Sequence, residues 1–108
     1  MKIVAVAACT VGIAHTYMAK EAIEKEAEKR GWDCVVETQG GMGIDDELEE
    51  DVIEDADLVL LAIAIGIEGD ERFDDKRDEN KVLTIDPSEV IKDSASVFDK
   101  LAEMGDEQ

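Results

Sequence analysis

Basic residues are scarce in this chain: 11 lysines and arginines stand against 29 aspartates and glutamates, giving a formal net charge of −18. Binding to nucleic acid requires clustered positive charge, so nucleic acid is excluded as a partner. An anionic membrane surface would repel the chain for the same reason. The acids are spread along the sequence rather than gathered in a tail, which favours adaptation to a high-salt cytoplasm over an ordinary acidic protein.

Cysteine and histidine are also rare. Cys9 and Cys34 lie 25 residues apart without forming a Cys-x-x-Cys pair, and His15 is the single histidine. Zinc sites use several such ligands at short spacing, so we expect no metal and no cofactor. Two cysteines at this separation do not indicate a secreted disulfide scaffold.

Long hydrophobic runs are missing. The first apolar segment is broken by Thr10 and Gly12, whereas a membrane-spanning helix needs ~18 or more apolar residues. Residues Ile3–Ala14 have the composition of a signal-peptide core, but cleavage there would remove the first strand of a regular strand–helix pattern. We therefore expect a cytoplasmic protein with no direct membrane insertion.

Aromatic residues are few, with one Trp, one Tyr and two Phe, so the core must be aliphatic. A length of 108 residues suits one domain, since single domains most often have ~100–150 residues. We expect that domain to span residues 1–104 and to be followed by a frayed tail over residues 105–108.

Strand and helix signals alternate along the chain. Four apolar segments predict buried strands: Lys2–Ala8, Trp32–Thr38, Leu58–Ile65 and Lys81–Ile85. The first predicted helix is His15–Arg30, which Gly31 caps, and the second runs from caps at Asp45 and Asp46 to about Asp55. One helical turn is predicted near Glu71–Asp75, and a last helix at Ser88–Met104 after Pro87. This order predicts an α/β fold: a small open four-stranded parallel sheet, doubly wound in the order 2-1-3-4, with helices on both faces.

Cys9 follows the first strand and opens a short loop, Cys9–Ala14, that leads into a helix. Such loops lie at the carboxyl edge of a parallel sheet, together with Gln39–Ile44 and the segment from Gly66 onward. A thiol at a helix N-terminus has a lowered pKa and is a competent nucleophile. A phosphoryl group on its sulfur would meet backbone N–H groups from about Val11 to Thr16, and Gly12 would allow close approach. A small buried cysteine without a chemical role is the alternative, and these residues leave both open.

The residues after Cys9 have two interpretations each. His15 is either a donor to the phosphoryl oxygens or an ordinary residue of the first helical turn, and Thr16 either adds a hydroxyl donor or caps the helix. Tyr17 and Met18 are expected to pack against the core. Cys34 is expected to be an inert residue inside the second strand.

The spacing Cys-x5-His-Thr is similar to the Cys-x5-Arg-Ser/Thr loop of tyrosine phosphatases. That loop clamps phosphate with an arginine, whereas this chain has His15 at the corresponding position. Without the clamp, the site is better suited to passing a phosphoryl group on than to hydrolysis. A phosphatase would also need a general acid, for which Asp70, Asp74 and Asp75 are candidates.

Residues Ala8–Glu24 (ACTVGIAHTYMAKEAIE) resemble the active-site segment of fructose-specific enzyme IIB of the phosphoenolpyruvate-dependent sugar phosphotransferase system, typically A-C-P-T-G-I-A-H-T-x-M-A-A-E-A-L. The resemblance continues through Val36–Ile44 (family E-T-Q-G), the acidic helix and strand of Asp45–Leu61, and Arg72-Phe73 (family R-F). Thr10 and Val11 replace the family's Pro and Thr, and the family's Asp after the third strand is missing from Ile63–Ile67.

The resemblance implies a phosphotransferase whose Cys9 accepts a phosphoryl group from a phosphohistidine of the IIA protein. Cys9 would pass it to fructose bound by the membrane permease IIC, giving fructose 1-phosphate. The phosphoryl-binding loop would comprise Thr10, Val11, Gly12, Ile13, Ala14, His15 and Thr16. Three residues at the neighbouring strand end are either partner contacts or part of a plain turn: Gln39, Gly40 and Met42. A low-molecular-weight cysteine phosphatase and a non-catalytic regulatory binding module are the alternatives.

Charge is absent from both loops. No Asp, Glu, Lys or Arg occurs from Ile3 to Ala19 or from Thr38 to Ile44. In a chain with 37% charged residues, these gaps mark the predicted site, with Val11, Ile13 and Met42 as an apolar docking rim.

Overall fold

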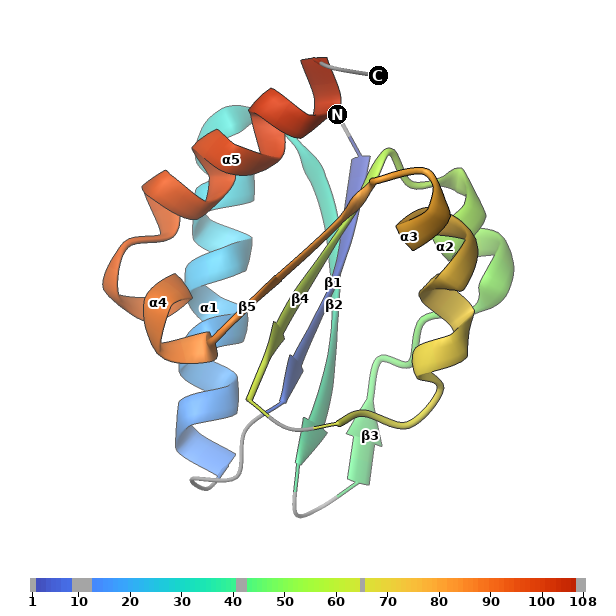
Figure 1. The fold of residues 1–108 in the computed structure, drawn as a ribbon. Coiled ribbons are helices and arrows are strands. Elements are labelled where there is room, and N and C mark those ends of the chain that lie inside the picture. Colours follow the sequence, from blue (N-terminus) through green and yellow to red (C-terminus); the bar gives the residue numbers. More distant parts are fainter. Residues whose placement is uncertain (1, 9–12, 41–42, 65, 107–108) are drawn as a thin grey trace.

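A twisted sheet divides the protein into two layers of helices (Figure 1). The structure is a computed structural model that describes residues 2–8, 13–40, 43–64 and 66–106. Within these residues the sheet has five strands in the order β3-β2-β1-β4-β5. The strands are β1 (Lys2–Ala8), β2 (Asp33–Gly40), β3 (Gly43–Asp45), β4 (Leu58–Ile63) and β5 (Val82–Ile85). The helices are α1 (Ile13–Arg30), α2 (Glu50–Asp55), η1 (Asp70–Phe73, a 3-10 helix), α3 (Asp74–Asp78), α4 (Pro87–Lys92) and α5 (Ser94–Asp106).

The four parallel strands confirm the predicted sheet. β1 pairs in parallel with β2 and β4, and β4 pairs in parallel with β5, which is the order 2-1-3-4 among the expected strands. β1 and β4 are buried along Ile3–Ala8 and Leu58–Ala62, as expected for central strands covered on both faces. Their apolar, non-alternating sequences therefore follow from their position in the sheet.

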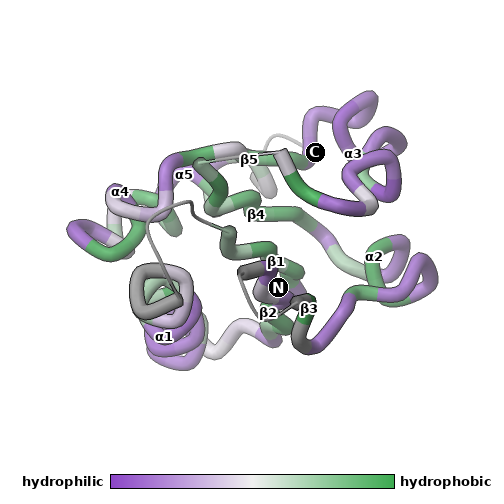
Figure 2. The backbone as a smooth tube through the Cα atoms, turned by 90° about the horizontal axis from the view of Figure 1, so that it is seen from below, coloured by the Kyte–Doolittle hydropathy of each residue, from purple (hydrophilic) through white to green (hydrophobic). Residues whose placement is uncertain are grey.

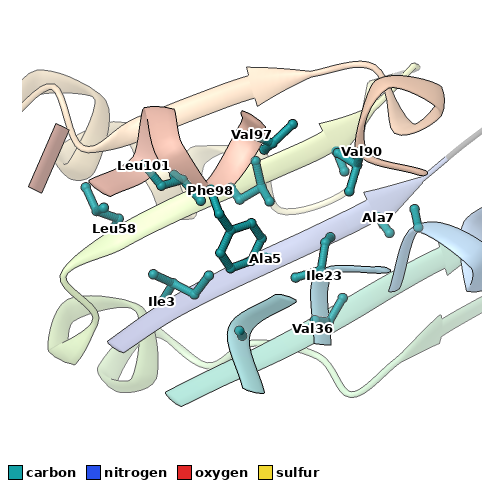
Figure 3. Packing of buried hydrophobic residues seen from close by; sticks show 14 residues of the cluster. Ile3, Ala5, Ala7, Ile23, Val36, Leu58, Val90, Val97, Phe98 and Leu101 are labelled. Carbon is teal, nitrogen blue, oxygen red and sulfur yellow. The ribbon is translucent and has the colours of Figure 1, made fainter. Parts of the chain in front are cut away.

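Alternate residues of β1 supply two separate cores. Ile3, Ala5 and Ala7 face α1, α4 and α5, where Phe98 fills the centre of the cluster (Figure 3). Val4 and Val6 face the opposite side and pack with Ile53 and Phe73 from α2 and η1. Seen from below, the hydrophobic strands lie between the helical layers, whose outer surfaces are mostly hydrophilic (Figure 2). The prediction of helices on both faces is confirmed.

The expected loop at Gln39–Ile44 is wrong. β2 continues to Gly40, and β3 returns antiparallel to it, pairing Gly40 with Gly43 and Thr38 with Asp45. The expected helix caps at Asp45 and Asp46 are also wrong, because Asp45 belongs to β3 and Asp46 has a left-handed backbone with φ 54°. α2 starts only at Glu50 and has no side-chain cap at Glu49.

The helix boundaries correct three further expectations. α1 begins at Ile13 rather than His15. The expected single turn near Glu71–Asp75 is the pair η1 and α3. The expected C-terminal helix is two helices, because Asp93 leaves helical geometry and its carboxylate accepts hydrogen bonds from the Ser96 amide and hydroxyl, which caps α5.

Two boundary signals are confirmed. Gly31 ends α1 with φ 72°, its amide bonds to the Glu28 carbonyl, and the Trp32 amide bonds to the Ala27 carbonyl, the Schellman arrangement. Pro87 is the first residue of α4, and the Asp86 side chain caps this helix by accepting a hydrogen bond from the Ser88 amide. α5 continues to Asp106, two residues past the expected end of the domain.

Candidate functional site

The candidate site lies where β1 ends at the carboxyl edge of the sheet. The register places Ala8, its last residue, between Gln39 of β2 and Ile63 of β4. The Ala64 amide donates to the Ala8 carbonyl at 3.1 Å, so the strand is held on both sides up to its final residue. The chain leaves the middle of the edge at this point, which is the position where ligands bind in doubly wound sheets.

Several predicted site residues fall beyond the described part of the chain. Cys9, Thr10, Val11, Gly12 and Met42 lie outside the described residues, and Ile13, Ala14 and His15 are described through their helical backbone only. The structure nevertheless places the residues on either side of the cysteine loop, because Ala8 ends β1 and Ile13 begins α1. The amino end of α1 lies at the same edge as the carboxyl ends of β1 and β2 (Figure 1).

The first turn of α1 is suited to an anion. Because the helix begins at Ile13, the N–H groups of Ile13, Ala14 and His15 have no acceptor inside the helix. No acidic residue occurs in that turn, so the positive end of the helix dipole is not compensated by a carboxylate of its own. Helix geometry and sequence together leave an electropositive backbone surface beside the end of β1.

Thr16 adds a buried hydroxyl to this turn. The residue is 2% exposed, and among the described residues its Oγ1 is the one buried side-chain oxygen or nitrogen without a hydrogen-bond partner. Burying an unpaired hydroxyl is unfavourable, so such a group calls for a functional explanation. Its place in the first turn of α1 makes it a donor available to a group bound at the helix end.

Gln39 occupies the neighbouring strand end but turns its side chain inward. Its amide donates to Glu37 Oε2 at 2.6 Å and to the Glu68 carbonyl at 3.0 Å, and its Oε1 accepts from the Glu68 amide at 2.9 Å. The residue is buried. A partner contact by Gln39 stays a prediction, but its side-chain amide is occupied by groups of this chain. Gly40 closes the hairpin with Gly43.

Fully buried Glu37 and partly buried Arg72 form an ion pair that was not predicted from the sequence. Glu37 is fully buried, and Arg72 donates to both of its carboxylate oxygens, at 2.8 and 3.0 Å. Burial alone would raise the pKa of the Glu37 carboxyl, but hydrogen bonds from Arg72, Gln39 and the Leu48 amide outweigh it and hold the pKa below its ordinary value. Glu37 is the one charged residue between Asp33 and Gly40, and this isolated charge in a buried strand was the available signal.

The arginines are all occupied by other groups. Arg72 also donates to the carbonyls of Leu48, Glu68 and Gly69. Arg77 pairs with Asp70 and Asp74, and Arg30 pairs with Glu26 and Asp99 beside Trp32. None of the three is free to clamp a phosphate, and two of the three candidate general acids of a phosphatase are held in ion pairs.

Two aromatic and apolar side chains beside the site are exposed. Tyr17 and Met18 follow Thr16 in α1 and are 42% and 51% exposed, so the expectation that they pack in the core is wrong. The expected docking rim of Val11, Ile13 and Met42 lies outside the described side chains. Tyr17 and Met18 therefore supply the described apolar surface next to the start of α1.

Among the described residues, no group of three or more His, Cys, Asp or Glu side chains converges as a metal site would require. The described helices include none with both the length and the apolar character needed to cross a bilayer.

Comparisons with known proteins find relatives that match nearly the whole chain. A family model described as "PTS system, Lactose/Cellobiose specific IIB subunit" matches residues 4–100. The chain is similar to the PTS system fructose-like EIIB component 2 of Escherichia coli (strain K12), at 41% identity over 93% of this chain and 91% of the relative. It is also 41% identical to the fructose-like PTS system EIIBC component of the same organism, over 94% of this chain but 20% of the relative.

Solved structures show the same arrangement of elements. A domain from the fructose-specific IIABC component of Borrelia burgdorferi has a TM-score of 0.84 and 41% identity, covering 93% of this chain and 91% of that one. A predicted fructose-specific IIB from Escherichia coli has a TM-score of 0.88 and 33% identity, covering 96% and 88%. The fold is therefore shared over nearly the whole chain.

Proposed function

This chain belongs to the IIB family of the sugar phosphotransferase system, and from that premise we propose that Cys9 is its phosphoryl carrier. The family resemblance expected from the cysteine loop and Glu37–Gly40 is confirmed, and with it a phosphotransferase role in sugar uptake. The proposal adds the residue that carries the phosphoryl group, its donor and its acceptor.

The observation that carries the proposal is the start of α1. A helix end without acidic residues and the unpartnered hydroxyl of Thr16 lie directly after the segment that contains Cys9. Fixed N–H groups and a hydroxyl stabilise a phosphoryl group without a metal, because they are already oriented before the group arrives. The loop would comprise Thr10 to Thr16, with Ile13 to Thr16 in the first turn of α1.

The transfer has two steps. The Cys9 thiolate attacks the phosphorus of a phosphohistidine on IIA, so that an S–P bond forms as the N–P bond breaks and the imidazole leaves with the bonding electron pair. In the second step, the C1 hydroxyl oxygen of fructose bound by IIC attacks the same phosphorus. An O–P bond forms, the S–P bond breaks to regenerate the thiolate, and the hydroxyl proton passes to a base of the permease. The products are fructose 1-phosphate and free Cys9, and the reaction takes place at the cytoplasmic side.

Fructose is the proposed sugar because the relatives are described as fructose-like or fructose-specific. The sugar itself is bound by the permease, so the described residues of this chain bear on phosphoryl transfer rather than on sugar recognition. Exposed Tyr17 and Met18 are the proposed apolar contacts for the two partners.

The occupied arginines argue against the phosphatase alternative. A hydrolase of this loop type stabilises the transition state with a bidentate arginine, and Arg30, Arg72 and Arg77 all bind carboxylates of this chain. A site that holds a phosphocysteine without such a clamp retains the group until a partner accepts it.

The test is phosphorylation by a phosphorylated fructose-type IIA protein, followed by intact mass and peptide mapping. We expect one phosphoryl group on Cys9, none in Cys9→Ser, and full labelling of the matched variant Cys34→Ser. Hydrolysis of an aryl phosphate without IIA would instead support a phosphatase. Absence of both reactions would leave a binding module and refute the carrier.

A further inference from the structure

A buried polar network joins three backbone segments at the carboxyl edge. The side chain of Gln39 binds both the N–H and the C=O of Glu68. Leu48 is held in the same way, with its N–H bound by Glu37 at 2.7 Å and its C=O by Arg72 at 2.7 Å. Side chains thus provide for these two segments the paired hydrogen bonds that a neighbouring strand would otherwise supply.

The network spans the strand that leads to Cys9. Gln39 is on β2 and Glu68 follows β4, while β1 lies between those two strands. The register sets Gln39 beside Ala8, the residue before Cys9. The Gln39–Glu68 contact therefore ties together the segments on both sides of Ala8, the last residue of β1, in addition to the backbone ladder.

Stability is a weak explanation for this arrangement. Glu37 is fully buried, and replacing buried ion pairs by apolar residues is often neutral or stabilising. The network also uses every donor of the Arg72 guanidinium, on Glu37 and on the carbonyls of Leu48, Glu68 and Gly69. Such complete pairing fixes geometry rather than adding apolar burial.

We propose that Gln39 is a positioning residue for phosphoryl transfer, held by Glu37 and Arg72 and acting through the strand ends on either side of Ala8. This inference rests on the proposed carrier function of Cys9. It assigns the Gln of the E-T-Q-G segment an internal task in place of a direct partner contact. A misplacement of ~1 Å in such an arrangement can reduce a rate by about 100-fold.

The test compares Gln39→Met with the unmodified protein at a temperature where circular dichroism shows both to be folded. Methionine keeps the length of the side chain and removes its hydrogen bonds. We expect the rate of Cys9 phosphorylation by phosphorylated IIA to fall about tenfold or more. Arg72→Lys keeps the charge but loses the forked geometry, and should show the same loss. It serves as the second variant if Gln39→Met does not fold.

Iodoacetamide provides a readout without any phosphoryl donor. Peptide mass spectrometry follows the rate of Cys9 alkylation as a function of pH. In Gln39→Met the midpoint of this profile should move toward ~8.5, the ordinary pKa of a cysteine thiol. The matched control is Arg30→Lys, which weakens another partly buried ion-pair cluster, at the carboxyl end of α1, and should change neither readout.

An unchanged rate and an unchanged alkylation profile in folded Gln39→Met would overturn the inference. Equal losses in Arg30→Lys would also overturn it, because they would trace the effect to general stability. If the unmodified protein is not phosphorylated on Cys9, the carrier function fails instead. The alkylation profile then still decides whether Gln39 positions the Cys9 segment.

Discussion

The buried hydroxyl of Thr16 affects both the stability of the fold and the proposed transfer of the phosphoryl group. An unpaired buried hydroxyl destabilises the folded state, and its removal by an isosteric apolar residue relieves that cost. We predict that Thr16→Val raises the free energy of unfolding by about 1 kcal/mol. The same change should slow phosphoryl transfer to Cys9 by about tenfold or more, because it removes one oriented donor. Urea unfolding and a quenched transfer assay measure the two effects.

The control for Thr16→Val is the same substitution at Thr84, which is exposed on β5. Thr84→Val should leave the transfer rate unchanged. A Thr16→Val protein that loses stability and keeps its rate would show that the hydroxyl contributes to packing rather than to phosphoryl binding.

The two cysteines should differ in reactivity. Burial, and to a lesser extent the nearby charge of Glu24, raise the pKa of Cys34 to about 12. The reactive thiolate is then on the order of 10⁻⁵ of the population at pH 7, since each pH unit below the pKa reduces it tenfold. We predict that iodoacetamide modifies Cys34 far more slowly than glutathione in the same solution, and that the rate rises throughout the alkaline range. Peptide mass spectrometry from pH 7 to 10 measures it, and a Cys34 rate near that of glutathione would contradict the prediction.

Among the elements, α2 depends on a cation from another helix. It has six residues and no side-chain cap at its start, and isolated helices of this length do not form. Lys76 of α3 is buried, and its ammonium group donates to two carbonyls at the carboxyl end of α2. These are the carbonyls of Glu54, at 3.2 Å, and Ala56, at 2.7 Å. The ammonium group therefore satisfies carbonyls that the short helix leaves unpaired and lies favourably against its dipole.

We predict that Lys76→Met lowers the free energy of unfolding by about 1–3 kcal/mol, because one buried and one partly buried carbonyl lose their charged donor. The matched control is Lys25→Met, which removes the same charge from an exposed pair with Glu21 and should cost about 0.5 kcal/mol or less. Urea unfolding compares the two variants. Equal losses would assign the effect to net charge rather than to the end of α2.

Strands and helices could be predicted from the sequence wherever burial sets the pattern. β1 and β4 have uninterrupted apolar sequences because both faces are covered, and Gly31 and Pro87 mark helix ends through their own backbone preferences. β3 could not be predicted, because its three residues, Gly43–Asp45, form a strand only through pairing with β2. The break at Asp93 was missed because one capping side chain decided it, within a segment that is helical on both sides.

The candidate site was predictable to a similar degree. The position of Cys9 before a helix followed from local order, and the structure places Ala8 and Ile13, the described residues nearest to it on either side, at the carboxyl edge. Gln39 binds Glu68, which is 29 positions away, and Glu37 pairs with Arg72, which is 35 positions away. Both interactions depend on tertiary contacts. An isolated Glu in a buried strand indicates that a partner exists, but only the fold identifies it.

The distribution of charge concerns the whole molecule. The net charge of −18 is carried mainly by helices and connections, including a groove between α2 and the segment before η1. Its carboxylates come from both sides: Glu47, Glu49, Glu50, Asp51, Glu54, Glu68 and Glu71. Like charges at this density repel one another and destabilise the compact state at low ionic strength. The two hydrophobic cores consist of apolar residues and do not contribute to this repulsion.

We predict that the protein is stabilised by salt. Between about 0.1 and 1 M potassium chloride the Debye length falls from about 10 to about 3 Å, which screens the repulsion between carboxylates. The Tm should rise by about 5 °C or more, since 1 kcal/mol corresponds to roughly 4–8 °C in a domain of this size. Scanning calorimetry measures the rise, and a Tm that does not change with salt would contradict an adaptation to a high-salt cytoplasm.

A charge-reduced variant separates screening from a general effect of solute on folding. Replacing Glu47, Glu49, Glu50 and Glu54 by Gln removes four carboxylates from the groove without changing side-chain shape. If repulsion is the cause, this variant has a higher Tm than the unmodified protein at low salt and a smaller rise on adding potassium chloride. If salt acts mainly by strengthening apolar burial, the Tm of both proteins rises by the same amount, because their two cores are identical. The slope of Tm against salt, rather than its value at one concentration, therefore decides between the two causes.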